Sequence, residues 1–173
     1  MWRTFGAQIL TGAAQPLFGD KLTAALAIPP HEVDPVLTVA STAIYQTGDR
    51  IVIDPLQTNQ DEVLVIRIIN GTTMQCSSQG ASMHAHAVNA ILQLDIACAD
   101  IMVQAKSSDA NSLFLGTDNT VTNAGAGNVV VEVTPGSLPF RMTNNGQWNS
   151  VRTNDLWMAG TATQVALVSA QVI

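Results

Sequence analysis

The feature that most limits how this chain can fold is a series of short β-branched runs, each of which ends at turn residues. The strongest run is Glu62 to Ile69, and it stops at Asn70-Gly71, a pair that favours a type I′ hairpin because both residues tolerate positive φ. Similar runs occupy residues 36–40, 51–53, 129–133 and 164–172. After residue 30 no apolar pattern of helical period extends over three turns. The sequence therefore predicts an all-β fold of small antiparallel β-barrel or β-sandwich units.

The distribution of turn residues divides the chain into three expected parts. Residues 1–35 scatter apolar side chains among Gly and Pro, which predicts an extended N-terminal arm in which Lys21–Ile28 is compatible with a short helix. Residues 36–107 are expected to form a first β-barrel-like domain, and residues 108–173 a second β-sandwich domain. An arm of this kind has to dock, either across its own domains or on a neighbouring subunit.

Charged side chains are scarce in this chain. They make up 12% of the 173 residues, against about 25% in ordinary soluble domains. A net charge of −6 and a pI near 4.7 argue against nucleic-acid binding through a basic face. The hydrophobic content of 47% argues against disorder. Because no apolar run is long enough to span a bilayer and the N-terminus lacks the apolar core of a signal peptide, we expect no membrane partner.

The small number of Lys and Glu residues bears on assembly. Surfaces buried between subunits are depleted in these two residue types, and the chain has only two Lys and three Glu. We therefore expect a homo-oligomer, with a trimer as the favoured state. The alternative is a monomer whose surface is covered by the abundant Thr, Ser, Asn and Gln side chains.

The histidines are the strongest candidates for chemistry. His84 and His86 lie two residues apart, so on a strand both rings would face the same side, as a metal site requires. A third ligand would have to come from His31, Asp49, Asp54 or Glu62. The simpler interpretation, which we favour, is a hydrogen-bonded structural histidine beside a strand of small residues.

The other polar and sulfur groups predict no site. Asp109 and Asp118 have nearby Asn residues, but their spacing fits no known calcium loop. Cys76 and Cys98 are expected to be two separate, half-buried thiols, although their spacing leaves a bond between them open. Nucleophile elbows, phosphate-binding loops and paired carboxylates are missing from the sequence. We therefore expect no enzyme, with no catalytic residue, no metal and no cofactor.

The large aromatic side chains are the best candidates for an interface, since Trp is the residue type that most often carries interface energy. The expected interface residues are Trp2, Phe5, Phe18, Trp148 and Trp157. The alternative for Trp148 and Trp157 is that they cap the core of the second sandwich.

Two sets of motifs carry a resemblance to a known family. The first set is Gly48-Asp49-Arg50-Ile51-Val52-Ile53-Asp54, the strand from Glu62, Asn70-Gly71-Thr72-Thr73 and Ala85-His86. The second set is Leu113-Phe114-Leu115-Gly116, Thr120-Val121, Pro135-Gly136 and the closing strand after Leu156-Trp157. Over residues 45–173 the chain resembles structural proteins of tailed bacteriophages, which include capsid decoration or cement proteins, head fibres and head–tail or tail components. These motifs make the fold, so the resemblance carries over no active residue.

The resemblance implies a virion protein that is assembled in the host cytoplasm. We expect a capsid decoration or cement protein that binds the major capsid protein or adjoining virion proteins, together with other copies of itself. One alternative is a tail, collar or head–tail connector component. Another is a carbohydrate-binding module on a virion fibre, in which Trp148 or Trp157 would stack on a sugar.

Overall fold

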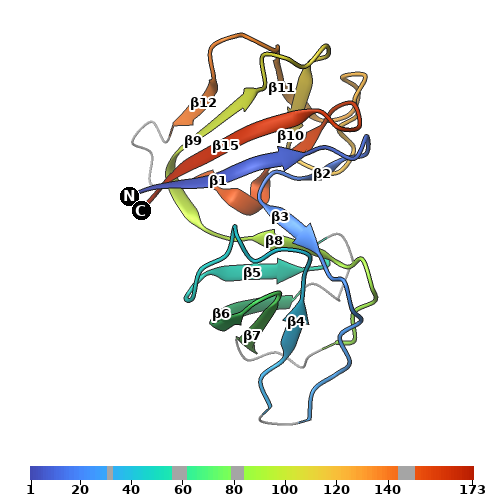
Figure 1. Cartoon of the computed structure of the whole chain (residues 1–173), viewed down its shortest axis with the longest axis vertical. Helices are drawn as coiled ribbons and strands as arrows, with labels where there is room; N and C mark the ends of the chain where they lie inside the picture. Colours follow the sequence, from blue (N-terminus) through green and yellow to red (C-terminus); the bar gives the residue numbers. More distant parts are fainter. Residues whose placement is uncertain (31–32, 56–61, 79–83, 144–150) are drawn as a thin grey trace. The chain divides into compact units, whose positions relative to one another are not determined.

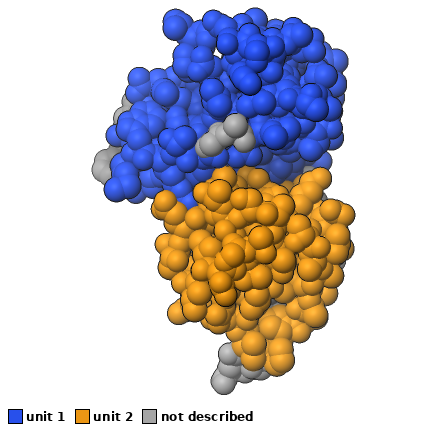
Figure 2. Space-filling model, viewed as in Figure 1, with its two compact units in different colours: residues 1–18, 96–173 blue, residues 19–95 orange. Residues whose placement is uncertain are grey.

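The chain is an all-β protein, and a computed structural model describes its residues 1–30, 33–55, 62–78, 84–143 and 151–173 (Figure 1). It divides into two compact units, which are coloured separately in Figure 2. Unit 1 consists of Met1–Phe18 together with Ile96–Ile173, and unit 2 consists of Gly19–Asp95. The chain therefore crosses from one unit to the other twice.

Unit 2 is a single six-stranded antiparallel sheet that curls into a half-barrel (Figure 1). In spatial order its strands are β3 (Gly19–Lys21), β8 (Ile91–Leu94), β5 (Arg50–Ile53), β6 (Glu62–Asn70), β7 (Thr73–Ser78) and β4 (Val36–Thr38). The two edges of the sheet meet just beyond β3 and β4, where Leu22 bridges Val39 and the Thr23 N–H donates to the Thr38 carbonyl at 2.8 Å. Aliphatic side chains such as Ile51, Leu64 and Leu92 fill the inside of the curl.

The predicted hairpin near Asn70-Gly71 is confirmed, but the predicted type I′ turn with these two residues at its centre is wrong. Asn70 pairs with Thr73, so Gly71 and Thr72 are the two central residues. Gly71 has a φ of 59°, whereas Thr72 has no positive φ. Positive φ at the first central position alone is the pattern of a type II′ turn, which glycine adopts without steric cost.

A β-bulge changes which residues of β6 face the core. The pairing with β7 shifts between Ile66 and Ile68, so Arg67 is an extra residue on the β6 side. Before the bulge Leu64 and Ile66 are buried, and after it Ile68 is 55% exposed. An extra residue reverses the in-and-out alternation of a strand, because side chains alternate with period two.

Unit 1 is a sandwich of two antiparallel sheets. The first sheet has the order β1 (Trp2–Ile9), β15 (Val165–Val172), β9 (Ala97–Ala105) and β12 (Phe140–Thr143), and β13 (Val151–Arg152) also pairs with β9. The second has the order β11 (Val129–Val133), β10 (Leu113–Gly116), β14 (Trp157–Ala159) and β2 (Gln15–Pro16). A short 3₁₀ turn, η1 (Thr153–Asp155), leads from β13 to β14. Buried side chains of both sheets form the core between them, among them Ile101, Val103, Leu113 and Leu115.

The structure differs from the expectation of a separate N-terminal arm. Residues 2–9 form β1, which pairs along its length with β15, and Pro16 in β2 pairs with Trp157. The Lys21–Ile28 segment is not helical, since Leu22 and Leu26 form bridges to Val39 and His86. The Gly and Pro residues of this N-terminal region connect short strands, and they do not form an extended arm.

The unit boundaries also differ from those expected. The divisions fall at residues 18/19 and 95/96, whereas the sequence suggested 35/36 and 107/108. The reason is strand pairing: β9 follows unit 2 in sequence but pairs with β15 and β12, so it lies in the same sheet as β1. Turn residues mark where strands end, but they do not reveal which strands pair.

Candidate interaction surface

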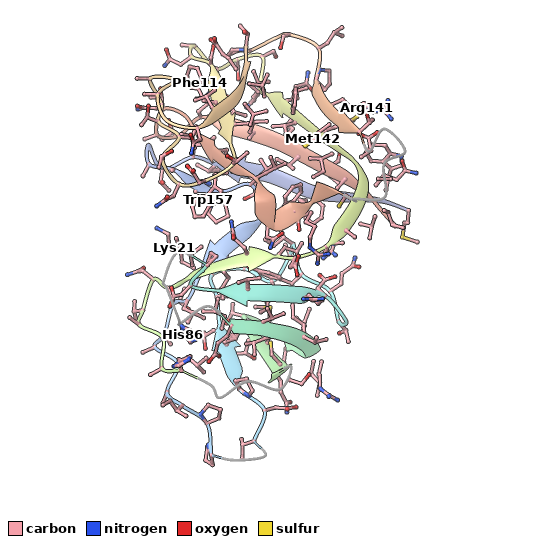
Figure 3. All side chains as sticks on the ribbon, turned by 180° about the vertical axis from the view of Figure 1, so that it is seen from behind. Lys21, His86, Phe114, Arg141, Met142 and Trp157 are labelled. Atoms are coloured by element: carbon pink, nitrogen blue, oxygen red, sulfur yellow. The ribbon has the colours of Figure 1, made fainter. Side chains whose placement is uncertain are left out.

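The structure places the five expected interface residues in three different environments. Phe5, Phe18 and Trp157 lie in the core of unit 1, where at most 4% of each residue is exposed (Figure 3 labels Trp157). Trp2 is 47% exposed. Trp148 lies outside the described residues. Burial removes the first three from any surface in this structure, because their apolar rings are already covered by their own chain.

The outer face of the five-stranded sheet is the candidate surface that the structure offers instead. Along β9, Ile101 and Val103 point into the core, so Met102 and Gln104 point outward. Along β15, Val168 is buried and its neighbours Leu167 and Ser169 are partly exposed. Because of this alternation, one face of the sheet packs in the core and the other face is accessible to a partner.

Strand register aligns the outward residues into rows across the sheet. Thr4 lies opposite Ser169, Ser169 opposite Met102, and Met102 opposite Arg141, so one row crosses all four strands. The next row contains Trp2 opposite Gln171, which lies opposite Asp100. The exposed Trp2 therefore belongs to the same face as the Met102 row.

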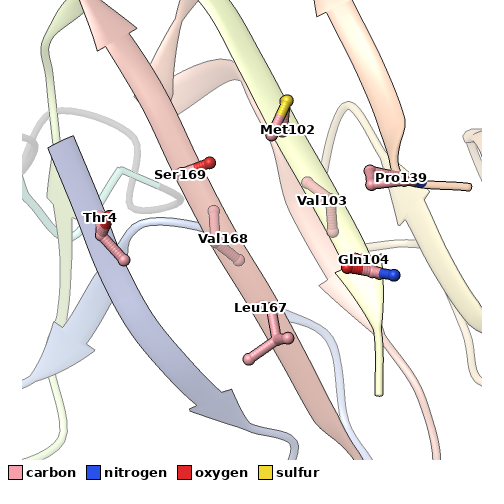
Figure 4. Close-up of a pocket in the computed structure, with 8 residues that line it drawn as sticks. All are labelled: Thr4, Met102, Val103, Gln104, Pro139, Leu167, Val168 and Ser169. Atoms are coloured by element: carbon pink, nitrogen blue, oxygen red, sulfur yellow. The ribbon is translucent and has the colours of Figure 1, made fainter. Parts of the chain in front are cut away.

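A shallow apolar groove of about 300 Å³ runs along this face (Figure 4). Its lining comes from β1, β15 and β9 and from the residue before β12, and consists of Thr4, Met102, Val103, Gln104, Pro139, Leu167, Val168 and Ser169. None of these side chains is charged. Leu138, which is adjacent to Pro139 in sequence, is 89% exposed. A partner that binds in this groove does not have to remove water from any charged side chain of the lining.

One ion pair borders the groove. The Arg141 guanidinium on β12 contacts the carboxylate of Asp100 on β9 through both Nε and one terminal nitrogen (Figure 3 labels Arg141). Asp100 is 2% exposed, whereas the Arg141 side chain is 57% exposed. The hydrogen bond to Asp100, and then the charge of that carboxylate, raise the pKa of Arg141. Because each charge compensates the other, the pair adds little net charge to this face.

In unit 2 one of the two expected histidines, His86, lies beside two of the expected acidic residues, Asp54 and Glu62 (Figure 3 labels His86). The Nδ1 atom of His86 lies 2.7 Å from Asp54 Oδ2, and its Nε2 atom lies 3.5 Å from Glu62 Oε2. The His86 side chain is fully buried and Glu62 is 5% exposed. His84 is exposed and reaches Glu62 only through its backbone N–H.

The contacts of His86 with Asp54 and Glu62 form a structural cross-link. It joins the end of β5, the start of β6 and the segment that bridges Leu26. Within the part of the chain that the structure describes, no group of three His, Cys, Asp or Glu side chains is placed to hold a metal ion. His31, one of the other expected ligands, lies outside that part.

The remaining candidate residues have local roles. Asp118 accepts hydrogen bonds from the N–H and the hydroxyl of Thr120, at 2.8 and 2.5 Å, and from the Asn128 amide. Asp109 accepts one from the Val165 N–H at 2.9 Å. Cys76 and Cys98 are free, buried thiols, one in each unit.

The sequence reasoning missed the groove residues, although part of the signal was present. Alternation along residues 97–105 places Met102 and Gln104 on one side of that strand, and alternation along residues 165–172 places Leu167 and Ser169 on one side of the other. Which face is covered depends on the partner sheet, and the sequence does not reveal that.

Comparison with protein-family models, with curated proteins and with solved structures gave no match to this chain. None of the described residues belongs to a helix of the length and apolar character needed to cross a membrane.

Proposed function

We propose that the protein is a structural component of a tailed-phage virion, a capsid decoration or cement protein that attaches to the particle through the outer face of the unit 1 sheet. It works by covering apolar surface on a neighbouring protein and thereby holding adjacent subunits together. Other copies of itself and the major capsid protein are the partners, and no chemical step is involved.

The observation that carries this proposal is the uncharged groove with exposed apolar side chains around it. Trp2 and Leu167 are 47% and 43% exposed on this face, and the groove itself has no charged lining residue. Interfaces between proteins concentrate aromatic residues, Met and aliphatic side chains at their centre and charged groups at their rim. The ion pair of Asp100 and Arg141 at the border fits such a rim.

The distribution of charge also supports unit 1 as the part of the chain that binds the particle. Unit 1 contains four Lys or Arg residues and five Asp or Glu residues, a net charge of −1, whereas unit 2 contains three and eight, a net charge of −5. Like charges on crowded neighbours repel. A nearly neutral unit 1 is therefore the unit better suited to close packing on a protein shell.

The proposal is tested by co-sedimentation of the purified chain with undecorated heads and, separately, with tails of the phage that encodes it. Leu167→Asp places a carboxylate in the groove and is expected to weaken binding to heads by about tenfold or more, because that charge would lose its water on binding. Ile68→Asp, at a 55% exposed strand position of unit 2, is the matched control and should bind like the wild type.

Three outcomes would overturn the proposal in whole or in part. Unchanged head binding by Leu167→Asp would show that the groove face is not the attachment surface. Absence of wild-type binding to heads and tails alike would remove the virion role. Binding to tails but not to heads would replace the decoration role with a tail or connector role.

The sugar-binding alternative receives no support from Trp157, which is only 3% exposed and so cannot stack on a ligand.

A further inference from the structure

The buried cluster of His86, Asp54 and Glu62 in unit 2 contains two nitrogen–oxygen contacts that both need a proton. The Nδ1 atom of His86 lies 2.7 Å from Asp54 Oδ2, and its Nε2 atom lies 3.5 Å from Glu62 Oε2. A neutral imidazole has one N–H and one bare nitrogen, whereas the imidazolium ion has two N–H groups. Because both ring nitrogens face a carboxylate oxygen, a neutral ring has one N–H too few.

Neither neutral form of the ring suits this site. With the proton on Nδ1, the ring donates to Asp54, but the bare Nε2 then faces Glu62 Oε2. With the proton on Nε2, the bare Nδ1 lies 2.7 Å from Asp54 Oδ2, and the lone pairs of the two atoms repel. Among the described residues, neither His86 Nε2 nor Glu62 Oε2 has a hydrogen-bond partner. A second ring proton supplies the donor that these two buried acceptors lack.

The charge of the cluster leads to the same protonation state. The His86 side chain is fully buried, and Glu62 and Asp54 are 5% and 16% exposed. With a neutral ring the cluster would contain two carboxylates and no cation, whereas an imidazolium lies between them and compensates one of their charges. A buried charge without a partner is costly. Imidazole is the strongest base of the three groups, so the second proton belongs on the ring.

No other charged side chain of the described residues faces the ring from the elements around it. Residues 22–28, which form a bridge to the histidine, and strand β8 contain no ionisable side chain. His84 is exposed, and it contacts the cluster through its backbone N–H. Arg50 and Arg67 are exposed and lie towards the opposite ends of β5 and β6. The two carboxylates are therefore the groups that determine the state of the ring.

We propose that His86 is held as an imidazolium ion in the folded protein at neutral and mildly alkaline pH, and that the His86 cluster is a proton-dependent latch of unit 2. The latch joins the end of β5, the start of β6 and the segment around His86. Loss of the second proton removes the attraction to Glu62 and leaves two buried acceptors face to face, so alkaline conditions loosen unit 2. The inference does not depend on the groove of unit 1 or on which particle the protein binds.

The linkage between folding and proton binding gives the direction of the pH effect. A histidine in an unfolded chain loses its proton near pH 6.5, so at about pH 8 the unfolded chain no longer holds it. The folded protein still holds it in the proposed state. Stability falls as the pH rises wherever the folded state binds more protons than the unfolded state. For one proton, the folding equilibrium constant falls about tenfold per pH unit until the folded ring is also neutral.

Nitrogen-15 NMR of the histidine rings in the full chain tests the protonation state directly. At about pH 8 we expect both ring nitrogens of His86 to show the chemical shifts of N–H groups. Spectra of His31→Ala and His84→Ala identify the signals of the other two rings. A bare ring nitrogen on His86 at this pH overturns the proposal. This measurement on the wild type stays decisive even if a variant of the cluster does not fold.

Glu62→Gln removes the need for the second proton. Its amide N–H can donate to the bare Nε2 of a neutral ring, and its oxygen can still accept from the His84 N–H. We therefore expect a neutral His86 ring in this variant at about pH 8. The matched control is Glu132→Gln, which removes the same charge from an exposed position on β11 in unit 1 and should leave the imidazolium signal unchanged.

Urea unfolding at a series of pH values above about 7.5, followed by the amide NMR signals of unit 2, tests the latch. We expect the folding constant of the wild type to fall about tenfold more per pH unit than that of Glu62→Gln. Glu132→Gln should follow the wild type. Equal pH slopes of the wild type and Glu62→Gln would overturn the latch even if the ring is charged. Head binding through the groove is not measured here, so failure of the virion role and failure of the latch give different results.

Discussion

Phe5 and Phe18 contact each other edge to face in the core of unit 1, with ring centroids 4.6 Å apart and planes at 75°. Phe5 belongs to the first strand, and Phe18 follows the second. At most 4% of each of these residues is exposed. The Arg3 guanidinium lies 5.0 Å from the Phe5 ring centroid. The N-terminal residues are thus a structural part of unit 1, held there by an aromatic pair.

This pair leads to a first prediction on stability. Phe5→Ala removes a buried aromatic ring and leaves a cavity beside Phe18, so unit 1 should lose about 3 to 5 kcal/mol of unfolding free energy. Urea unfolding followed by tryptophan fluorescence, to which the buried Trp157 contributes, measures this loss. The control Trp2→Ala removes a larger but 47% exposed ring, and should cost much less. Equal losses from the two variants would contradict the placement of Phe5 in the core.

The buried histidine of unit 2 leads to a second prediction. His86→Ala leaves the Asp54 and Glu62 carboxylates without the ring that lies between them, and removal of one partner from a buried charged group typically costs about 3 to 5 kcal/mol. His84→Ala removes an exposed ring and keeps the backbone N–H that donates to Glu62, so it should be close to neutral. Thermal unfolding by circular dichroism compares them. A stability of His86→Ala equal to that of His84→Ala would mean that the cross-link has no structural role.

A third prediction concerns the Asp118 loop. Hydrogen bonds from the side chains of Thr120 and Asn128, and from the Thr120 N–H, lower the pKa of Asp118. A carboxyl with a lowered folded pKa stabilises the loop above its unfolded pKa, and this contribution is lost as the pH falls through the folded pKa. Thr120→Val should raise the pKa of Asp118 towards its ordinary value, as measured by NMR titration of the carboxyl carbon.

The matched control for this titration is Thr122→Val. The Thr122 hydroxyl accepts from the Ala126 N–H in the same loop and is not bonded to Asp118. The pKa of Asp118 should stay low in this variant. A similar rise in both variants would show that loop integrity, and not the Thr120 hydroxyl, sets the pKa.

A fourth prediction concerns the two thiols. Burial raises the pKa of Cys76 to about 12 and that of Cys98 to about 11. Because the thiolate is the reactive form, both cysteines should react slowly with Ellman's reagent at pH 8 in the native protein and rapidly once it is unfolded. The single variants Cys76→Ser and Cys98→Ser assign each rate to its thiol. Rapid reaction of either thiol in the native state would show that its unit opens locally.

Sequence reasoning predicted the β elements well and their partners poorly. The Glu62–Ile69 run and the Asn70-Gly71 signal correspond to β6 and the turn into β7, because β-branched content and turn residues act locally. The same reasoning assigned Phe5, Phe18 and Trp157 to an interface, since the size of a side chain does not reveal what covers it. Trp2 alone of the described interface residues is substantially exposed.

The amino-acid sequence by itself determined the all-β class, the position of the main hairpin and the scarcity of charge, because each of these depends on residue type and on near neighbours in the chain. Only the tertiary structure decided that β1, β9 and β15 share a sheet, that His86 lies between Asp54 and Glu62, and that Met102 and Leu167 line an open groove. These features join residues far apart in sequence. They depend on which strands pair and on which faces stay uncovered. Both are determined only when the whole chain packs.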